Sequence, residues 1–235
     1  MIFGKIRRFQ ELKKVPKQYL RYALGELVLI VLGVLIAVSI DNWNEDRIKE
    51  KAIDAVLLKI GKDLDEDLIE IQNIQTHYDI RKPLFDRLMK GEYQEKSLVN
   101  CKECHFLISG HRLFRPNTEG YTSLKNTLNN SSIVDSELVY FIQSYTTLLE
   151  ELDLMSNNIV EDVNGNLMGW RDNYDWFTSF FEGKNENGYL DYRLKNPEYR
   201  NKVTYHYALV YNNYLPVLEN FKTLSNEFRA IVERK

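Results

Sequence analysis

The chain has 235 residues, of which 44% are hydrophobic and 28% are charged, and its formal net charge is −3. This composition is typical of a folded protein and excludes a chain that is disordered throughout. Because the net charge is slightly negative and the basic residues concentrate at the N-terminus, we expect no nucleic-acid partner. The mean hydropathy of −0.41 nevertheless conceals one strongly apolar window near the start of the chain.

A transmembrane helix is predicted for residues 22–42. The run from Tyr22 to Ile40 holds a single charged side chain, Glu26, and its length of about 19 residues is close to the roughly 20 that cross a bilayer. A buried helix of a soluble protein is usually shorter. A cleaved signal peptide has an apolar region of about 7–15 residues followed by a small-residue cleavage site, and no such site follows Ile40.

Charged residues are distributed unequally about the predicted span. Before it stand Lys5, Arg7, Arg8, Lys13, Lys14, Lys17 and Arg21 against one acid, Glu11, and after it follow Asp41, Glu45 and Asp46. This bias predicts a cytoplasmic N-terminus and an exported C-terminal domain. Residues 1–21 form a basic segment with the pattern of an amphipathic helix on an anionic leaflet of the lipid bilayer. Tyr19, Tyr22 and Trp43 are candidate anchors at the two interfaces.

Three residues of the span are candidates for helix association. Glu26 is an acid near the cytoplasmic end, and an acid within a span is a functional candidate by default. It can hydrogen-bond a neighbouring helix, pair with a partner subunit or handle a proton, or it can simply reach water at the interface. Gly25 and Gly33 are eight residues apart and lie on nearly one face, so they can admit a close helix neighbour.

Beyond Trp43 the apolar residues follow heptads, which predicts a stalk helix. We assign residues 43–95 to the stalk and expect its helix to end at Pro83 or Gly91. Its stripe consists of Ile53, Leu57, Ile60, Leu64, Asp67, Ile71, Ile74 and Tyr78. A second stripe consists of Leu138, Ile142, Tyr145, Leu149 and Leu152, with Asp135 or Ser136 as the N-cap. A third consists of Val203, Tyr207, Val210, Tyr214, Val217, Phe221, Leu224, Phe228 and Ile231, and we expect Pro216 to kink that helix.

These stripes predict an all-α fold, in which one N-terminal transmembrane helix continues into the stalk and an antiparallel helical bundle follows. Residues 96–235 supply the remainder of the exported domain. The stripe of the stalk can be buried within the chain, or it can form a coiled coil between chains. The pattern leaves both arrangements open.

The sequence CKECH, residues 101–105, fits the C-x-x-C-H pattern of covalent haem attachment. A local disulfide between Cys101 and Cys104, or two packed thiols, requires no other residues, whereas a haem also requires an apolar pocket. We therefore favour the disulfide or the packed thiols. A metal site that adds His105 and His111 lacks a standard zinc spacing. We therefore expect no cofactor and no metal. The common hydrolase, nucleotide and zinc-protease motifs are also missing, so we expect no catalytic residues and no enzyme activity.

Two other clusters have simple structural interpretations. The acidic run DLDEDLIE, residues 63–70, lacks the glycine turn of a calcium loop, and we interpret it as a solvated helix face. An aromatic cluster either forms a binding surface or packs a helix end into the core. Its members are Trp170, Tyr174, Trp176, Phe177, Phe180 and Phe181.

The segment YALGELVLIVLGVLIAVSIDNWNE, residues 22–45, resembles the membrane segment of a family of uncharacterised single-pass envelope proteins of Bacteroidetes-type bacteria, labelled only as a domain of unknown function. The segment FRPNTEGYTSLKNT is similar to the middle segment of that family, through Phe114, Pro116, Tyr121, Leu124 and Lys125. The resemblance implies a bacterial inner-membrane protein with a periplasmic helical domain. It implies no known activity.

The leading hypothesis is a non-enzymatic envelope scaffold or accessory subunit that acts through helix–helix association. Its expected partners are a second copy of the chain or another envelope membrane protein. A periplasmic ligand-binding sensor module is the alternative, and a haem protein that uses CKECH is a third hypothesis.

Overall fold

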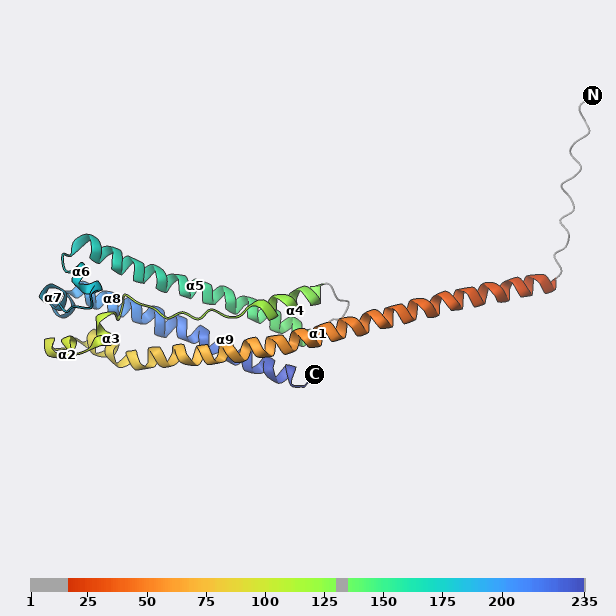
Figure 1. Ribbon diagram of the computed structural model, residues 1–235, viewed down its shortest axis with the longest axis horizontal. Coiled ribbons are helices and arrows are strands. Elements are labelled where there is room, and N and C mark those ends of the chain that lie inside the picture. Colours follow the sequence, from red (N-terminus) through yellow and green to blue (C-terminus); the bar gives the residue numbers. More distant parts are fainter. Residues whose placement is uncertain (1–16, 130–134, 235) are drawn as a thin grey trace, which may run out of the picture. The chain divides into compact units, whose positions relative to one another are not determined.

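The computed structural model describes residues 17–129 and 135–234, and the described residues form an all-α fold (Figure 1). The prediction of the fold class is therefore confirmed. The helices are α1 (Lys17–Lys90), α2 (Glu95–Val99), α3 (Lys102–His105), α4 (Glu119–Asn129), α5 (Ser136–Asn173), α6 (Phe177–Phe181), α7 (Asn187–Lys195), α8 (Pro197–Tyr207), the π-helix η1 (Ala208–Tyr214) and α9 (Leu215–Val232).

Helix α1 contains Pro83 and ends at Lys90. Gly91 has a φ of +70°, a conformation in which a residue without Cβ is not strained. The N–H of Gly91 bonds the carbonyl of Leu88 at 3.1 Å, and the N–H of Glu92 bonds that of Arg87 at 3.0 Å, which is the Schellman pattern. Of the two predicted endpoints, Gly91 is therefore right and Pro83 is wrong.

The chain divides into two compact units, residues 1–52 and residues 53–235. In the first unit, the described residues lie on α1 and their side chains are almost all exposed. In the described part of the chain, α1 is the one helix long and apolar enough to cross a membrane, with a mean hydropathy of 2.7 over its most apolar window. No part of that window is buried within the chain.

The second unit is built around three long helical stretches, which are α1 from Ile53 onward, α5, and the run from α8 through η1 to α9 (Figure 1). The ion pair between Asp65 and Arg229, at 3.0 Å, and the hydrogen bond between Gln75 and Glu219, at 2.8 Å, place α1 and α9 antiparallel. As the residue number rises on one helix, it falls on the other.

Helix α5 is also antiparallel to the C-terminal run. Phe141 stacks on Phe228 with ring centroids 3.6 Å apart, while Asp162 bonds His206 at 2.7 Å farther along both elements. Asp135 caps α5 by accepting hydrogen bonds from the first-turn N–H groups of Glu137 and Leu138, at 3.0 and 3.1 Å. Because α1 and α5 both oppose the same run, they are parallel to each other.

The three predicted stripes all contribute to the core of this unit, which also includes residues outside them, such as Phe114, Phe141 and Trp170. All eight stripe residues of α1 are at most 7% exposed, and their neighbours in the core come from α5, η1 and α9. The stripe is therefore buried within the chain, and the alternative of an interchain coiled coil through these residues is wrong. An apolar heptad repeat is expected both in a bundle within one chain and in a coiled coil between chains. The two differ in which helices cover the stripe, and here these helices belong to the same chain.

The C-terminal run changes its helical winding in the middle. Residues 208–214 form a π-helix, and Pro216 is within the first two residues of α9. Proline lacks the N–H that would bond a carbonyl in the preceding turn, and its ring crowds that turn. A wider turn ahead of proline relieves the crowding, so the run from α8 to α9 continues instead of ending at Pro216.

Candidate functional site: a segment clamped between the helices

An extended segment, residues 110–118, returns along the helices from α3 to α4, and we call it the return segment (Figure 1). Since α1 and α5 are parallel, the chain between them has to run back along the domain before α5 can begin. Residues 110–117 of the return segment form no helix or strand, and the carbonyl of Thr118 accepts the N–H of Thr122, in the first turn of α4, at 2.9 Å. The buried backbone groups of residues 110–117 therefore need partners from the surrounding helices.

Two tyrosines supply partners for the first half of the return segment. The hydroxyl of Tyr78, on α1, donates to the carbonyl of Arg112 at 3.0 Å and accepts from the N–H of Arg112 at 3.1 Å. The N–H of Phe114 donates to the hydroxyl oxygen of Tyr214, on η1, at 2.6 Å. Burial raises the pKa of both tyrosines, so both remain neutral hydroxyls that can bond the backbone.

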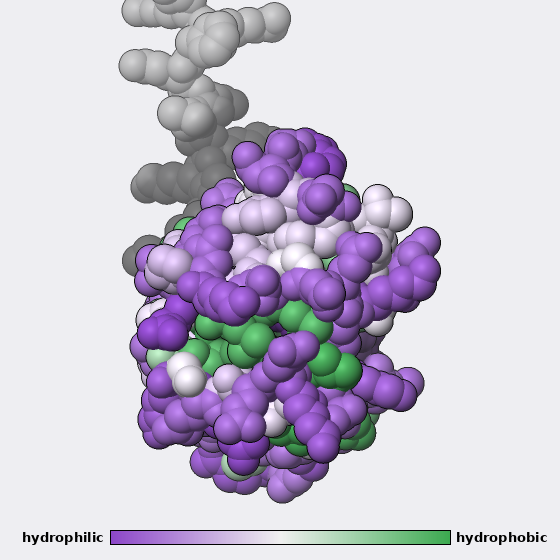
Figure 2. Space-filling model, turned by 90° about the vertical axis from the view of Figure 1, so that its left-hand side faces the viewer, coloured by the Kyte–Doolittle hydropathy of each residue, from purple (hydrophilic) through white to green (hydrophobic). Residues whose placement is uncertain are grey.

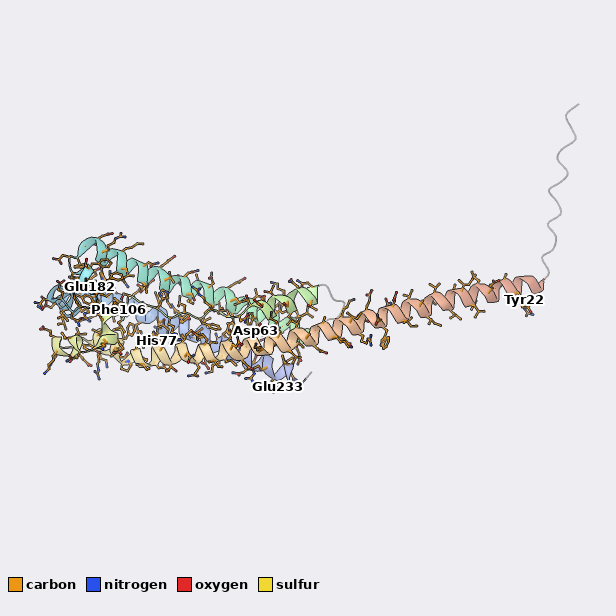
Figure 3. The ribbon with its side chains drawn as sticks, viewed as in Figure 1. Tyr22, Asp63, His77, Phe106, Glu182 and Glu233 are labelled. Atoms are coloured by element: carbon orange, nitrogen blue, oxygen red, sulfur yellow. A yellow bond between two sulfur atoms is a disulfide. The ribbon has the colours of Figure 1, made fainter. Side chains whose placement is uncertain are left out.

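Two carboxylates of α1 hold the second half, and we call Asp63 and Asp67 with their hydrogen bonds the clamp. Asp67 accepts the N–H of Asn117 with both oxygens, at 3.1 and 3.3 Å. Asp63, whose place on α1 is labelled in Figure 3, accepts two further hydrogen bonds. They come from the side-chain amide of Asn117, at 3.1 Å, and from the N–H of Gly120, in the first turn of α4, at 3.0 Å. The carboxylate of Asp63 thus caps α4 from another helix.

The interpretation of residues 63–70 as a solvated face is wrong for these two residues, because Asp63 is 6% exposed and Asp67 is 5% exposed. Burial raises the pKa of Asp67 to about 7, the bond from Asn117 opposes the rise, and the negative charges of Asp63 and Glu66 add to it. Burial and the charge of Asp67 also raise the pKa of Tyr145, on α5. The return segment is therefore held by a buried acid that titrates near neutral pH.

Gly120 lies where α4 comes close to α1. A Cβ at this position would lie 2.7 Å from Oδ2 of Asp63, 2.7 Å from Cγ1 of Ile60 and 3.1 Å from the main-chain Cα of Ile60. A side-chain rotation cannot move the last of these atoms aside, because it belongs to the backbone of α1. The glycine in the sequence NTEGY is therefore required by packing, and no positive φ is involved.

We expect Gly120→Ala to destabilise the domain by about 1–3 kcal/mol, because the added methyl group would crowd the backbone of α1. Urea unfolding of the full chain, followed by the helical signal, measures this loss. Gly165→Ala is the matched control, since a Cβ at Gly165 meets nothing within 4 Å. Equal stability of the two variants would contradict the packing role of Gly120.

A cavity of about 350 Å³ lies on the other side of the return segment, against α5. The return segment contributes Leu113, Phe114, Arg115, Pro116 and Thr118, and α5 contributes Leu149, Leu152, Asp153, Ser156, Asn157 and Val160. The same nine-residue segment is therefore clamped to α1 through its backbone and forms one wall of a cavity with its side chains.

Residues 26–157 match the profile of a family of unknown function, DUF6090. The match covers more than half of the chain. The chain belongs to the DUF6090 family. The matched region includes α4, the return segment and both aspartates of the clamp, and it ends within α5. No curated protein matches the chain, and no solved structure matches it.

Beyond the matched region, α5 and α8 share a buried polar pair. Nδ1 of His206 lies 2.7 Å from Oδ2 of Asp162, and their side chains are 1% and 7% exposed. Asn166 donates to the carbonyl of Ile108 at 3.1 Å and to the same oxygen of Asp162 at 3.4 Å. The His206 ring stacks in parallel on Phe85 of α1. This pair joins α5 to α8, immediately ahead of the π-helix that follows His206.

The CKECH residues of this DUF6090 protein lie at the end of the domain that holds α2, α6 and α7. Cys101 and Cys104 form a disulfide, and Cys101 caps the short helix α3 by accepting the N–H of Cys104. His105 is 4% exposed, and its ring nitrogens lie 2.8 Å from the carbonyl oxygen of Phe180 and 3.3 Å from Oδ1 of Asn185.

This arrangement does not fit a covalent haem, because both sulfurs are joined to each other and both nitrogens of His105 face protein oxygens. His111 is exposed and lies in the return segment. Among residues 17–129 and 135–234, no group of three or more histidine, cysteine or acidic side chains could hold a metal ion.

The aromatic cluster is mostly core. Trp170, Trp176 and Phe180 are at most 3% exposed, and the indole of Trp170 donates to the hydroxyl of Tyr192 at 3.0 Å. Phe181 is instead exposed. An apolar patch with a hydrophilic surround is visible at this end of the domain (Figure 2), where Val99, Phe106 and Phe181 are the exposed large apolar residues of α2, the end of α3 and α6.

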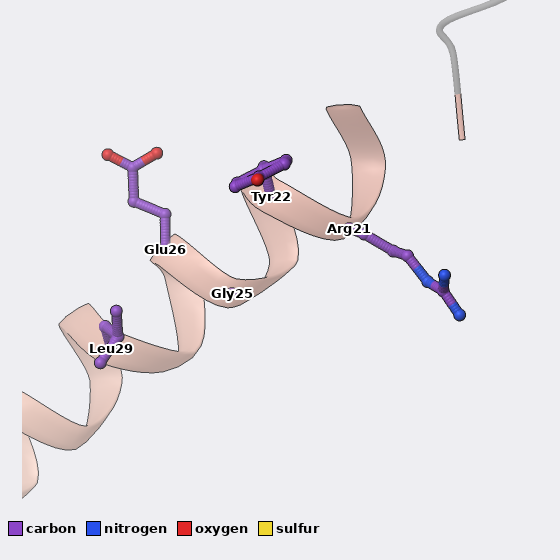
Figure 4. A pocket seen from close by; sticks show the side chains of 5 residues that line it. All are labelled: Arg21, Tyr22, Gly25, Glu26 and Leu29. Carbon is purple, nitrogen blue, oxygen red and sulfur yellow. The ribbon is translucent and has the colours of Figure 1, made fainter. Parts of the chain in front are cut away.

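The association candidates lie on α1 in the first unit. A Cβ at Gly25 or Gly33 would meet nothing within 4 Å. Glu26 projects away from the helix, beside a shallow hollow over Gly25 that Arg21, Tyr22 and Leu29 complete (Figure 4). Among the predicted anchors, Tyr22 is 82% and Trp43 is 65% exposed. The side chain of Tyr19 and residues 1–16 lie outside the described part of the chain.

Proposed function

We propose that this protein is a non-enzymatic accessory subunit or scaffold of a bacterial inner membrane, anchored by residues 22–42. In this proposal the N-terminus is cytoplasmic and the helical domain is periplasmic, as the charge bias of the sequence predicts. The membrane helix associates with a second copy of the chain or with another envelope membrane protein.

The exposed apolar window of α1 carries this proposal. None of the window is buried within the chain, so lipid or another helix has to cover it. Gly25 and Gly33 leave the helix surface open to a close neighbour, and small residues of this kind line helix contacts in membranes. Glu26 lies beside Gly25, where a hydrogen bond to a partner helix would offset the cost of placing an acid in lipid.

The roles of the buried polar side chains support a non-enzymatic protein. Asp63 and Asp67 bond the backbone of the return segment and of α4, and His105 faces the backbone of Phe180. His206 is engaged with Asp162 in the core. These groups are occupied in holding the fold together, whereas catalytic groups converge on a space that a substrate can enter.

We expect the full chain in mild detergent to form a particle heavier than one chain, and Gly33→Leu to shift it toward the monomer because leucine keeps a partner helix at a distance. Glu26→Gln should weaken association less, since glutamine still hydrogen-bonds. Size-exclusion chromatography with light scattering measures the protein mass in each particle.

Val31→Leu is the matched control, because residue 31 lies on nearly the opposite side of the helix from residue 33. Its particle should have the wild-type mass. A monomeric wild-type chain, or equal masses for Gly33→Leu and the wild type, would overturn the proposal of association through this face.

A further inference from the structure

The cavity between the return segment and α5 has the size of a small-molecule site. Its volume of about 350 Å³ is within the usual range of about 300–1,000 Å³ for ligand pockets. Liquid water occupies roughly 30 Å³ per molecule, so the space is that of about a dozen waters. A ligand with about a dozen non-hydrogen atoms would fill it.

The floor and walls of the cavity are largely apolar. Phe114 and Leu152 are 3% and 4% exposed, and Leu113, Pro116 and Leu149 are half-buried beside them. Filling this space with an apolar group removes apolar surface from water, which favours binding. The hydroxyl of Ser156, on the α5 wall, is buried and has no hydrogen-bond partner among the described residues.

The charged groups of the lining come from opposite walls. Arg115 belongs to the return segment and Asp153 belongs to α5, and both are exposed. Within residues 21–129 and 135–234 neither of them forms an ion pair, with each other or with another side chain. Asp153 accepts only a hydrogen bond from the amide of Asn157, at 3.1 Å. In this part of the chain, the rim of the cavity thus has one unpaired cation and one unpaired anion.

We propose that this cavity binds a small zwitterion with an apolar body, the chemical class of apolar amino acids and very short peptides. The carboxylate of the ligand pairs with Arg115, its ammonium group pairs with Asp153, and its apolar part lies over Phe114 and Leu152. An anion alone would leave Asp153 unpaired beside it, and a cation alone would leave Arg115 unpaired. A zwitterion pairs with both Arg115 and Asp153.

This site goes beyond association through the membrane helix and is independent of it. It would make the exported domain a ligand-binding module. Every lining residue except Val160 lies within the region matched by the DUF6090 profile. A ligand that bridges the two walls would also tie the return segment to α5, in addition to its bonds to α1.

The test uses the full chain in phosphatidylcholine nanodiscs, because detergent monomers could enter an apolar cavity. Isothermal titration calorimetry compares L-phenylalanine with 3-phenylpropionate and 2-phenylethylamine, which keep the ring and one charge each. We expect L-phenylalanine to bind at least about tenfold more tightly than either analogue, the factor that one charge-assisted contact commonly supplies.

The variants separate the two charged contacts. With Arg115→Gln, L-phenylalanine should bind no better than 2-phenylethylamine, and with Asp153→Asn it should bind no better than 3-phenylpropionate. Arg112→Gln is the matched control, since Arg112 precedes the cavity and pairs with Glu70 at 3.6 Å. It should leave all three affinities unchanged.

Three outcomes would overturn the proposal. The first is equal affinity of the three probes for the wild type, and the second is unaltered L-phenylalanine binding in both rim variants. The third is the absence of any heat of binding up to about 10 mM probe, well above a dissociation constant of about 1 mM. Association is measured separately, from the particle mass of the chain in mild detergent, so a failure of ligand binding in nanodiscs is distinguishable from a failure of association.

Discussion

The free energy of unfolding should fall by about 3 kcal/mol between pH 5 and pH 8 through the titration of Asp67 alone. The folded state raises the pKa of this carboxyl from 3.8 to about 7, chiefly because Asp67 is buried. Between these two values the folded chain holds a proton that the unfolded chain has released. This contribution to stability is therefore fully present below pH 3.8 and is lost as the pH rises through about 7.

Asp67→Asn should remove this pH dependence, because asparagine is neutral throughout the range and can still accept the N–H of Asn117. At pH 5 the two should have similar stability, and at pH 8 the variant should be more stable than the wild type by about 3 kcal/mol. Denaturant unfolding of the full chain at several pH values measures the slopes. Asp65→Asn is the matched control, since Asp65 is an exposed partner of Arg229.

The outcome that contradicts this prediction is a parallel pair of pH profiles for the wild type and Asp67→Asn. A positive result has a structural meaning beyond stability. Asp67 bonds the backbone of the return segment, so its ionisation places a second negative charge beside Asp63 where the segment enters α4. Loosening at higher pH should therefore begin at the clamp.

The heptad repeats were sufficient to predict the three long helical stretches and the faces that they bury. Each of the three stripes lies on a buried helix face, and residue type and position limited the N-cap of α5 to Asp135 or Ser136, of which the structure has Asp135. The partner of each stripe could not be predicted, because a period of 3.5 residues is shared by bundles within a chain and coiled coils between chains.

The clamp was partly visible in the sequence. Asp67 interrupts an otherwise apolar stripe, and a polar residue at a core position requires a buried partner. That partner, Asn117, is 50 residues away in an extended segment with no periodicity, so its position depends on the return path between two parallel helices. Asp63 had no such signal, because it is adjacent to the stripe and not part of it.

The cavity could not be predicted either, because it also depends on the path of the return segment, which has no periodicity. Its lining joins the return segment to α5, and only Leu149 and Leu152 belong to a recognised stripe. The DUF6090 match includes this region and the sequence RPNTEGY lies in it, but neither indicates which residues are in contact. The geometry adds that one short segment serves both the clamp and the cavity.

We expect Asp162→Ala to destabilise the domain by about 3 kcal/mol, because it leaves the imidazole of His206 buried without its partner. His206→Phe should have a cost of similar size. Phenylalanine can keep the parallel stacking on Phe85, but the carboxylate of Asp162 then keeps only the distant amide of Asn166, at 3.4 Å.

The double variant separates the pair from general loss of packing. If the cost of each single change arises from an orphaned buried group, the double variant removes both groups, and its cost should be at least about 1 kcal/mol below the sum. Denaturant unfolding of the wild type and the three variants closes this cycle. Asp191→Ala, which breaks an exposed pair with Lys195, should have far less effect. An additive cycle would show that His206 and Asp162 contribute through packing alone, and that the bridge between α5 and α8 is not held by their hydrogen bond.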